Sequence, residues 1–84
     1  MNIESPPEVM FRVRSFVSKA LDVEIGDSDN LFESGLISSL FGIQLITFIE
    51  RSFSLIVSDD DLVLDNFSSV ENISRFVVRK RAAQ

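Results

Sequence analysis

Residues 31–53 read LFESGLISSLFGIQLITFIERSF, and this stretch holds both a turn and the start of a long apolar-rich segment. Gly35 supplies the turn, and the apolar residues after the serine pair Ser38-Ser39 recur at helical spacing. We therefore expect a helix over residues 39–53. Ser39 then places a hydroxyl in the first turn of that helix, at the end of a loop, where a second protein could reach it.

The expected helix 39–53 has two unlike faces. The face that we expect to be buried consists of Leu45, Ile46, Ile49 and Phe53, with Gly42 permitting close approach. The outward face carries Leu40, Ile43, Gln44, Thr47 and Arg51, whereas Phe41 and Phe48 share a flank. Because the outward face is apolar beside Ser39, two interpretations are open. Either the preceding loop covers Leu40 and Ile43, or these residues form a patch on which a partner docks.

A second main helix is expected before this stretch. Ser5, Pro6 and Glu8 have the N-cap, first-turn proline and capping-box spacing of a helix start. The inward stripe of this helix comprises Val9, Val13, Phe16, Val17 and Ala20. Residues 22–37 then form a long connection, and the apolar side chains that we expect to pin it to the core are Val23, Ile25, Leu31, Phe32 and Leu36.

The apolar run 55–57, which follows the stretch, predicts an extended and buried connection. Ser58 and the three acidic residues after it are typical of a helix start, so we expect a short helix over roughly 59–64 that Asp65 and Asn66 interrupt. The capping-box spacing from Ser68 to Glu71 opens a last helix, with inward residues Val70, Ile73, Phe76 and Val77. The sequence thus predicts an all-α fold in a single domain over residues 1–84: a small four-helix bundle, three main helices plus one short helix, with a long first loop.

Composition narrows the classes of function. The chain has 84 residues, 45% of them hydrophobic, which indicates one small globular domain rather than a disordered segment. Cysteine and histidine are both absent, so the usual thiolate ligands and nucleophile–base pairs cannot be built. Three consecutive acids at 59–61 do not converge on one ion, so no metal site is expected. We expect a chain without catalytic residues, on which other proteins act.

Charge and hydropathy bear on the partners and the location. A net charge of −5 argues against a nucleic-acid partner and favours basic patches on protein partners. No apolar run approaches the ~20 residues of a membrane span. Residues 1–8 also lack the basic cluster and apolar core of a signal peptide. We therefore expect a cytoplasmic monomer with no membrane partner.

Residues 35–40 read GLISSL, and four more short segments accompany them: DNLF at 29–32, ERSF at 50–53, VSDDDL at 57–62 and NFSSV at 66–70. In order and spacing these segments resemble the motifs of acyl carrier proteins, within the larger carrier-protein family of fatty acid, polyketide and nonribosomal peptide synthesis. The attachment motif of that family is usually Gly-x-Asp-Ser-Leu, or Gly-Leu-x-Asp-Ser-Met. The resemblance covers essentially the whole chain.

The resemblance implies that Ser39 carries 4′-phosphopantetheine, added covalently from coenzyme A by a separate phosphopantetheinyl transferase. The arm would hold an acyl or aminoacyl group as a thioester for polyketide, hybrid polyketide/nonribosomal peptide or related biosynthesis. Its thiol would supply what a chain without cysteine lacks. The other implied partners are an acyl-loading enzyme and downstream synthase, transferase or tailoring enzymes. We expect partners to dock on Leu40, Phe41, Ile43, Thr47 and Glu50.

The sequence departs from the family pattern in two ways. Ser38 stands where the family usually has an aspartate that aids recognition by the transferase, so modification would be slower or would need a matched transferase. The helix 39–53 carries only Glu50 and Arg51 as charged residues, so docking should depend on apolar contacts more than on charge. Residues 39–45 and 47–50 are also similar to a freestanding subgroup that holds unusual malonyl-type extender units.

A rival interpretation needs no prosthetic group. In it the chain is a helical interaction module that is never acylated. Leu40, Phe41 and Ile43 bind a partner protein, and Ser39 only caps its helix.

Overall fold

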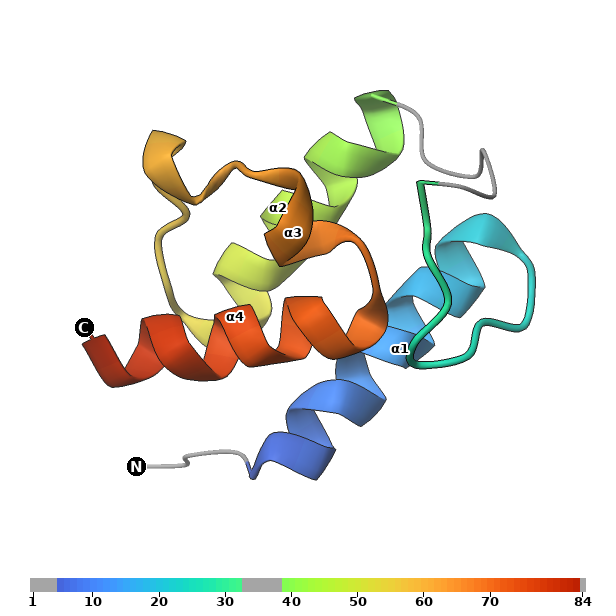
Figure 1. Cartoon of the computed structure of the whole chain (residues 1–84), viewed down its shortest axis with the longest axis horizontal. Coiled ribbons are helices and arrows are strands. Elements are labelled where there is room, and N and C mark those ends of the chain that lie inside the picture. The colour runs from blue at the N-terminus through green and yellow to red at the C-terminus, as the bar shows by residue number, and fades with distance from the viewer. Residues whose placement is uncertain (1–4, 33–38, 84) are drawn as a thin grey trace.

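The structure, a computed structural model, describes residues 5–32 and 39–83, with Ser39 described by its backbone alone. These ranges contain helices and no strand, as Figure 1 shows. In chain order the elements are α1 (Pro6–Leu21), α2 (Ser39–Phe53), the 3₁₀ turn η1 (Asp59–Asp61), α3 (Leu64–Phe67) and α4 (Val70–Ala83). The predicted all-α bundle, with three main helices and a long first loop, is confirmed.

Helix α1 begins as its sequence predicts. Ser5 Oγ accepts a hydrogen bond from the Glu8 N–H at 3.4 Å, and the Glu8 carboxylate accepts one from the Ser5 N–H at 3.2 Å. Both bonds satisfy donors that a helix start leaves without an intrahelical partner. The buried residues of α1 are Val9, Val13 and Val17, whereas Phe16 is half-buried. The expectation for Ala20 was wrong: it is exposed, because α1 ends one residue later and Leu21 takes the half-buried position.

Helix α2 forms over the predicted residues and buries its predicted face, apart from Ile46, which is half-buried. Its buried residues, Phe41, Leu45, Ile49 and Phe53, follow one another at four-residue spacing. α2 meets α1 through phenylalanine rings. The ring of Phe16 stacks on that of Phe48 with centroids 4.2 Å apart, and on that of Phe41 with centroids 6.2 Å apart.

Helix α4 packs most extensively against α1 and α3, and it buries the four apolar residues that the sequence predicts. Its N-terminal cap differs from the prediction. Ser69, not Ser68, accepts the cap bond, from the Asn72 N–H at 3.1 Å. Because α4 begins at Val70, Asn72 occupies the third helical position, and Glu71 is left to pair with Arg75 at 3.1 Å.

The first loop is anchored to α4 by its backbone. The Leu31 N–H donates to Ser68 O at 2.8 Å, and Asp27 O accepts from the Glu71 N–H at 2.9 Å. Ile25 and Leu31 are buried, as predicted. The expectation that Val23 and Phe32 belong to the core was wrong, because both are exposed; beside Phe32, Leu31 takes the buried position. Leu36 lies outside the described residues.

The segment after α2 corrects the sequence prediction. Instead of one helix over 59–64, η1 ends at Asp61 and α3 then includes the predicted breakers Asp65 and Asn66. The Asp61 carboxylate turns back and accepts the Ser58 N–H at 2.9 Å, which closes the turn after three residues. Phe67 then packs on Phe76 of α4, with ring centroids 5.4 Å apart.

The connection 55–57 is buried only in part. Leu55 is buried, Val57 is half-buried and Ile56 is exposed, because successive side chains of an extended chain point to opposite sides. No helix in the described part of the chain combines the length and the apolar character that a membrane crossing requires.

Candidate functional site

Ser39 is the first residue of α2. The first backbone N–H groups of a helix have no intrahelical acceptor, and the helix dipole places partial positive charge there. The first turn of α2 carries no acidic side chain to compete for that charge. A negatively charged group linked to the Ser39 hydroxyl would therefore sit in a favourable field. Ser38 lies outside the described residues.

Within the described residues, three serines that directly precede helical turns already use their hydroxyls. Ser5 Oγ accepts from the Glu8 N–H, Ser58 Oγ donates to Asp61 Oδ2 at 2.8 Å, and Ser69 Oγ accepts from the Asn72 N–H. In α4, the buried Ser74 donates its hydroxyl to Val70 O at 2.8 Å. These four serines thus take part in the hydrogen bonding of the bundle.

Two apolar side chains stand exposed directly after Ser39. Leu40 and Ile43 each keep 65% of their surface accessible in the described structure, and Thr47, one turn further along α2, is exposed as well. Of the two interpretations of this face, the described residues support the exposed patch. The prediction that Phe41 belongs to the docking surface was wrong. Only 4% of its surface is accessible, because it faces α1 and its ring stacks on that of Phe16. It belongs to the core and not to a docking surface.

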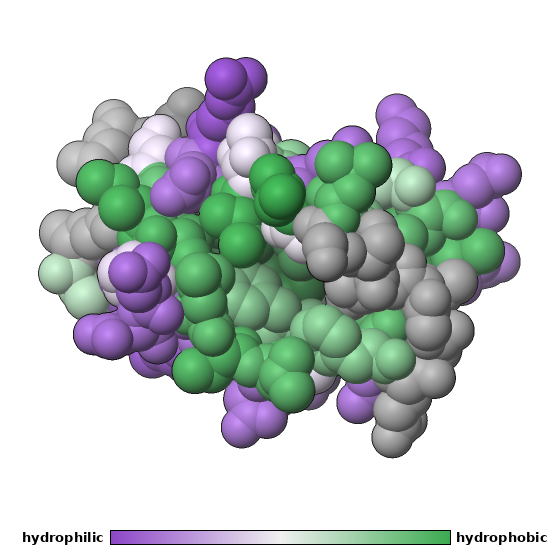
Figure 2. All heavy atoms as spheres, turned by 90° about the horizontal axis from the view of Figure 1, so that it is seen from above, coloured by the Kyte–Doolittle hydropathy of each residue, from purple (hydrophilic) through white to green (hydrophobic). Residues whose placement is uncertain are grey.

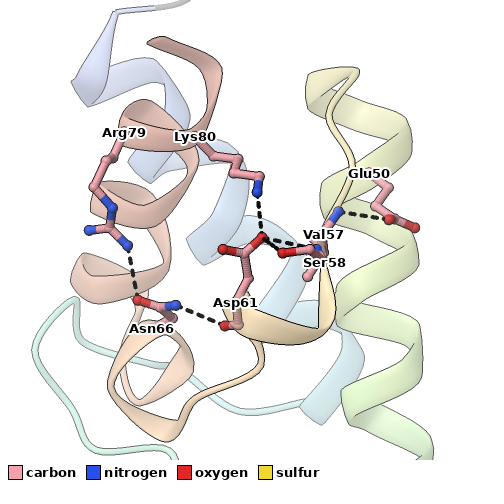
Figure 3. A network of polar contacts seen from close by, with 7 residues as sticks. All are labelled: Glu50, Val57, Ser58, Asp61, Asn66, Arg79 and Lys80. Carbon is pink, nitrogen blue, oxygen red and sulfur yellow. Dashed lines mark hydrogen bonds and ion pairs between the residues drawn. The ribbon is translucent and has the colours of Figure 1, made fainter. Parts of the chain in front are cut away.

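Glu50 has a structural contact that the sequence did not suggest. One oxygen of its carboxylate accepts the Val57 N–H at 2.9 Å, as Figure 3 shows. This bond joins the last turns of α2 to the connection that follows. Glu50 is half-buried, so a docking role for it must coexist with this contact.

A second group of exposed apolar residues lies on the segment from η1 to α3. Leu62, Val63 and Leu64 are all at least half exposed, and Leu64 reaches 69%. Figure 1 places this segment and the start of α2 on the upper side of the molecule, and Figure 2, viewed from above, shows apolar atoms gathered across that side. We call Leu40, Ile43, Leu62, Val63 and Leu64 the α2–α3 apolar patch. In the sequence, Leu62, Val63 and Leu64 form an apolar triplet between two acidic residues, and this pattern was the signal for the second half of the patch.

A polar network holds the segment that carries this triplet (Figure 3). Lys80 Nζ lies 2.6 Å from Asp61 Oδ2, Asn66 Nδ2 donates to Asp61 O at 2.8 Å, and Arg79 donates to Asn66 Oδ1 at 3.1 Å. The hydrogen bond from Lys80, followed by those from Ser58, lowers the pKa of Asp61 to about 2. Asp61 lies in a helical first turn, as the sequence predicts, and its pairing with Lys80 of α4 is a contact that the sequence did not suggest. The described residues contain no group of three or more side chains able to hold a metal ion.

The chain matches the family model described as "Phosphopantetheine attachment site" over residues 12–77, which includes all of α2 and α3. The chain therefore belongs to the phosphopantetheine-attachment family, whose domains carry covalent 4′-phosphopantetheine and interact with phosphopantetheinyl transferases and partner enzymes. No curated protein sequence shows significant similarity to it. The residues present fit the prosthetic group, which requires a hydroxyl for its phosphodiester and brings its own thiol to a chain without cysteine.

Proposed function

We propose that the protein is an acyl carrier in which Ser39 bears the 4′-phosphopantetheine. The observation that supports this most directly is the position of Ser39, at the first residue of α2 and inside the family match over residues 12–77. In the transfer, the Ser39 hydroxyl oxygen attacks the β-phosphorus of coenzyme A and forms a phosphodiester. The hydroxyl proton is lost, and 3′,5′-adenosine bisphosphate leaves. The chain itself supplies the nucleophilic oxygen and the helix start that accommodates the phosphate.

The holo protein would carry an acyl or aminoacyl thioester on the terminal thiol of the arm. Its pathway would be polyketide, hybrid polyketide/nonribosomal peptide or related biosynthesis. The similarity of residues 39–45 and 47–50 to carriers of malonyl-type extender units favours that class of cargo. The loading and downstream enzymes would dock on the α2–α3 apolar patch and Thr47. We further propose that the carrier acts as a cytoplasmic monomer in one domain.

Intact mass spectrometry after incubation with coenzyme A and a broad-specificity transferase tests the proposal. The wild type and Ser38→Ala should each gain the mass of one phosphopantetheinyl group, whereas Ser39→Ala should gain none. If Ser39→Ala is modified and Ser38→Ala is not, the attachment site is Ser38. If the wild type gains nothing, the rival interpretation as an interaction module that is never acylated is favoured.

A further inference from the structure

A surface groove of about 250 Å³ lies between the start of α1 and the second half of α4. The residues that line it are Pro6, Met10, Ser74, Arg75, Val78 and Arg79. In Figure 1 these parts of α1 and α4 lie at the lower left, whereas α2 begins at the upper right. We propose that this groove, which we call the α1–α4 groove, binds an acidic and apolar peptide segment of a partner protein. It would tether the carrier while leaving the start of α2 accessible.

The floor of the groove suits an apolar side chain. Met10 is half-buried, Val78 is partly exposed, and both border the groove. Ser74, the polar residue between them, directs its hydroxyl to Val70 O at 2.8 Å and so presents no unsatisfied group. A side chain that enters the groove removes apolar surface from water on both partners, which is the main favourable contribution to such binding.

The rim of the groove suits carboxylates. Residues 72–84 contain four basic and no acidic side chains, although the whole chain has a net charge of −5. Lys80 turns away to Asp61, but Arg75 and Arg79 border the groove. The side chain of Arg75 is 68% exposed and, among the described residues, pairs along its own helix with Glu71, while Arg79 donates to Asn66 at 3.1 Å. Because a guanidinium has five N–H donors, both arginines keep donors for a carboxylate from a partner.

Two other occupants fit the groove less well. An anionic membrane is flat and is bound by a convex apolar helix face, whereas this site is concave. A second copy could offer its own acidic and apolar segment, residues 59–64. Copies that each carry a net charge of −5 repel one another, which disfavours this contact. A segment of a different protein meets the same chemistry without these costs.

Selection from a random library of short linear peptides displayed on phage tests the proposal. The bait is the full chain, as the wild type and as the double variant Arg75→Gln/Arg79→Gln. The matched control is Lys19→Gln/Arg51→Gln, which also removes two exposed positive charges but lies outside the groove. We expect the wild type and the control to enrich peptides that combine acidic and apolar residues, and the double variant to lose them. Thermal melts of all three proteins establish that the fold is kept.

An enriched peptide, synthesised and titrated into the labelled protein, should shift the amide signals of Met10, Ser74 and Val78 and leave those of Leu40 and Ile43 in place. Its affinity for the double variant should be weaker by about 5-fold or more. The proposal is overturned by equal enrichment on the double variant, by peptides that are basic, or by shifts confined to α2. It is also overturned if phosphatidylserine vesicles or a second copy, detected by sedimentation, occupy the groove instead. The transferase should modify Arg75→Gln/Arg79→Gln as well as it modifies the wild type. Failure of the groove proposal can therefore be distinguished from failure of the proposal that Ser39 is the attachment site.

Discussion

Lys80 near the end of α4 and Asp61 of η1 are joined by an ion pair of 2.6 Å, and the same carboxylate oxygen of Asp61 also accepts hydrogen bonds from the backbone N–H and the hydroxyl of Ser58. This oxygen fixes one end of the segment that carries Leu62, Val63 and Leu64. The other end is fixed by Phe67, which is buried against α4. The position of the exposed residues Leu62, Val63 and Leu64 therefore depends on a polar contact with α4.

The first prediction concerns acid stability. The hydrogen bond from Lys80, followed by those from Ser58, holds the pKa of Asp61 at about 2 in the folded protein, against an ordinary value of 3.8. Because the folded state favours the charged form, this contribution to stability is fully present above the unfolded pKa and is lost as the pH falls through about 2. Asp61→Asn should therefore show a flatter decline of Tm between pH about 4 and about 2 than the wild type does.

The matched control for this measurement is Asp60→Asn, the exposed neighbour within η1. It should keep the wild-type dependence of Tm on pH, whereas Lys80→Met should resemble Asp61→Asn. Equal slopes for Asp61→Asn and the wild type would show that the ion pair adds nothing to the stability of the fold.

The second prediction separates scaffold from surface on helix α2. Ile49 is fully buried, between Leu45 and Phe53 on the inward face. Truncation of a buried isoleucine to alanine costs about 2–5 kcal/mol, and a domain this small has a free energy of unfolding near the lower end of about 5–15 kcal/mol. Ile49→Ala should lose most of its cooperative unfolding transition, whereas Ile43→Ala should melt close to the wild type because Ile43 is 65% exposed. Thermal melts followed by far-UV circular dichroism measure the Tm of both variants. A lower Tm for Ile43→Ala than for Ile49→Ala would place the core on the opposite face of α2.

The sequence predicts this fold well where one helix face is apolar over several turns. The valines of α1, the buried residues Leu45, Ile49 and Phe53 of α2 and the four buried residues of α4 all lie where the 3.6-residue period places them. The errors fall at the ends of elements and in short segments, where one hydrogen bond decides the outcome. The hydrogen bond from the Ser58 N–H to the Asp61 carboxylate closes η1 after three residues, before the predicted end of the helix. At the start of α4 the capping residue is Ser69, one residue after the predicted Ser68.

The candidate site was predictable in part for the same reason. The outward positions of Leu40, Ile43 and Thr47 follow from the helical period, and the structure leaves all three exposed. Phe41 was misplaced because a flanking position is inward or outward according to what packs beside it, and here Phe16 of α1 does. The contribution of Leu62, Val63 and Leu64 could not be derived from periodicity, because η1 and α3 are too short to show any.

The third prediction tests whether docking depends on apolar contact or on charge. Ile43→Asp should reduce kcat/KM for phosphopantetheinyl transfer by about 5-fold or more, because an interface leucine or isoleucine contributes on the order of 1–3 kcal/mol. Glu50→Gln is the matched charge variant, since its amide oxygen can still accept the Val57 N–H. It should change kcat/KM by less, as surface ion pairs contribute roughly 0–1 kcal/mol. A larger loss for Glu50→Gln, with a steep dependence on salt, would assign docking to charge.

The last prediction joins the polar network to the docking surface. Leu64, the most exposed residue of the triplet at 69%, should contribute to transferase docking without contributing to the fold, so Leu64→Ser should keep the wild-type Tm and lower kcat/KM by about 5-fold. Phe11→Ser on α1, which removes an apolar side chain of similar exposure (59%) from a different helix, is the control and should leave kcat/KM unchanged.

Lys80 lies outside the proposed docking surface, but Lys80→Met removes the ion pair that holds Asp61. This variant should therefore also lower kcat/KM, because the segment that carries Leu62, Val63 and Leu64 would be displaced. If that is its mechanism, the effects of Lys80→Met and Leu64→Ser must be less than additive in the double variant. Fully additive losses would mean that Lys80 acts on the transferase independently of the segment it holds.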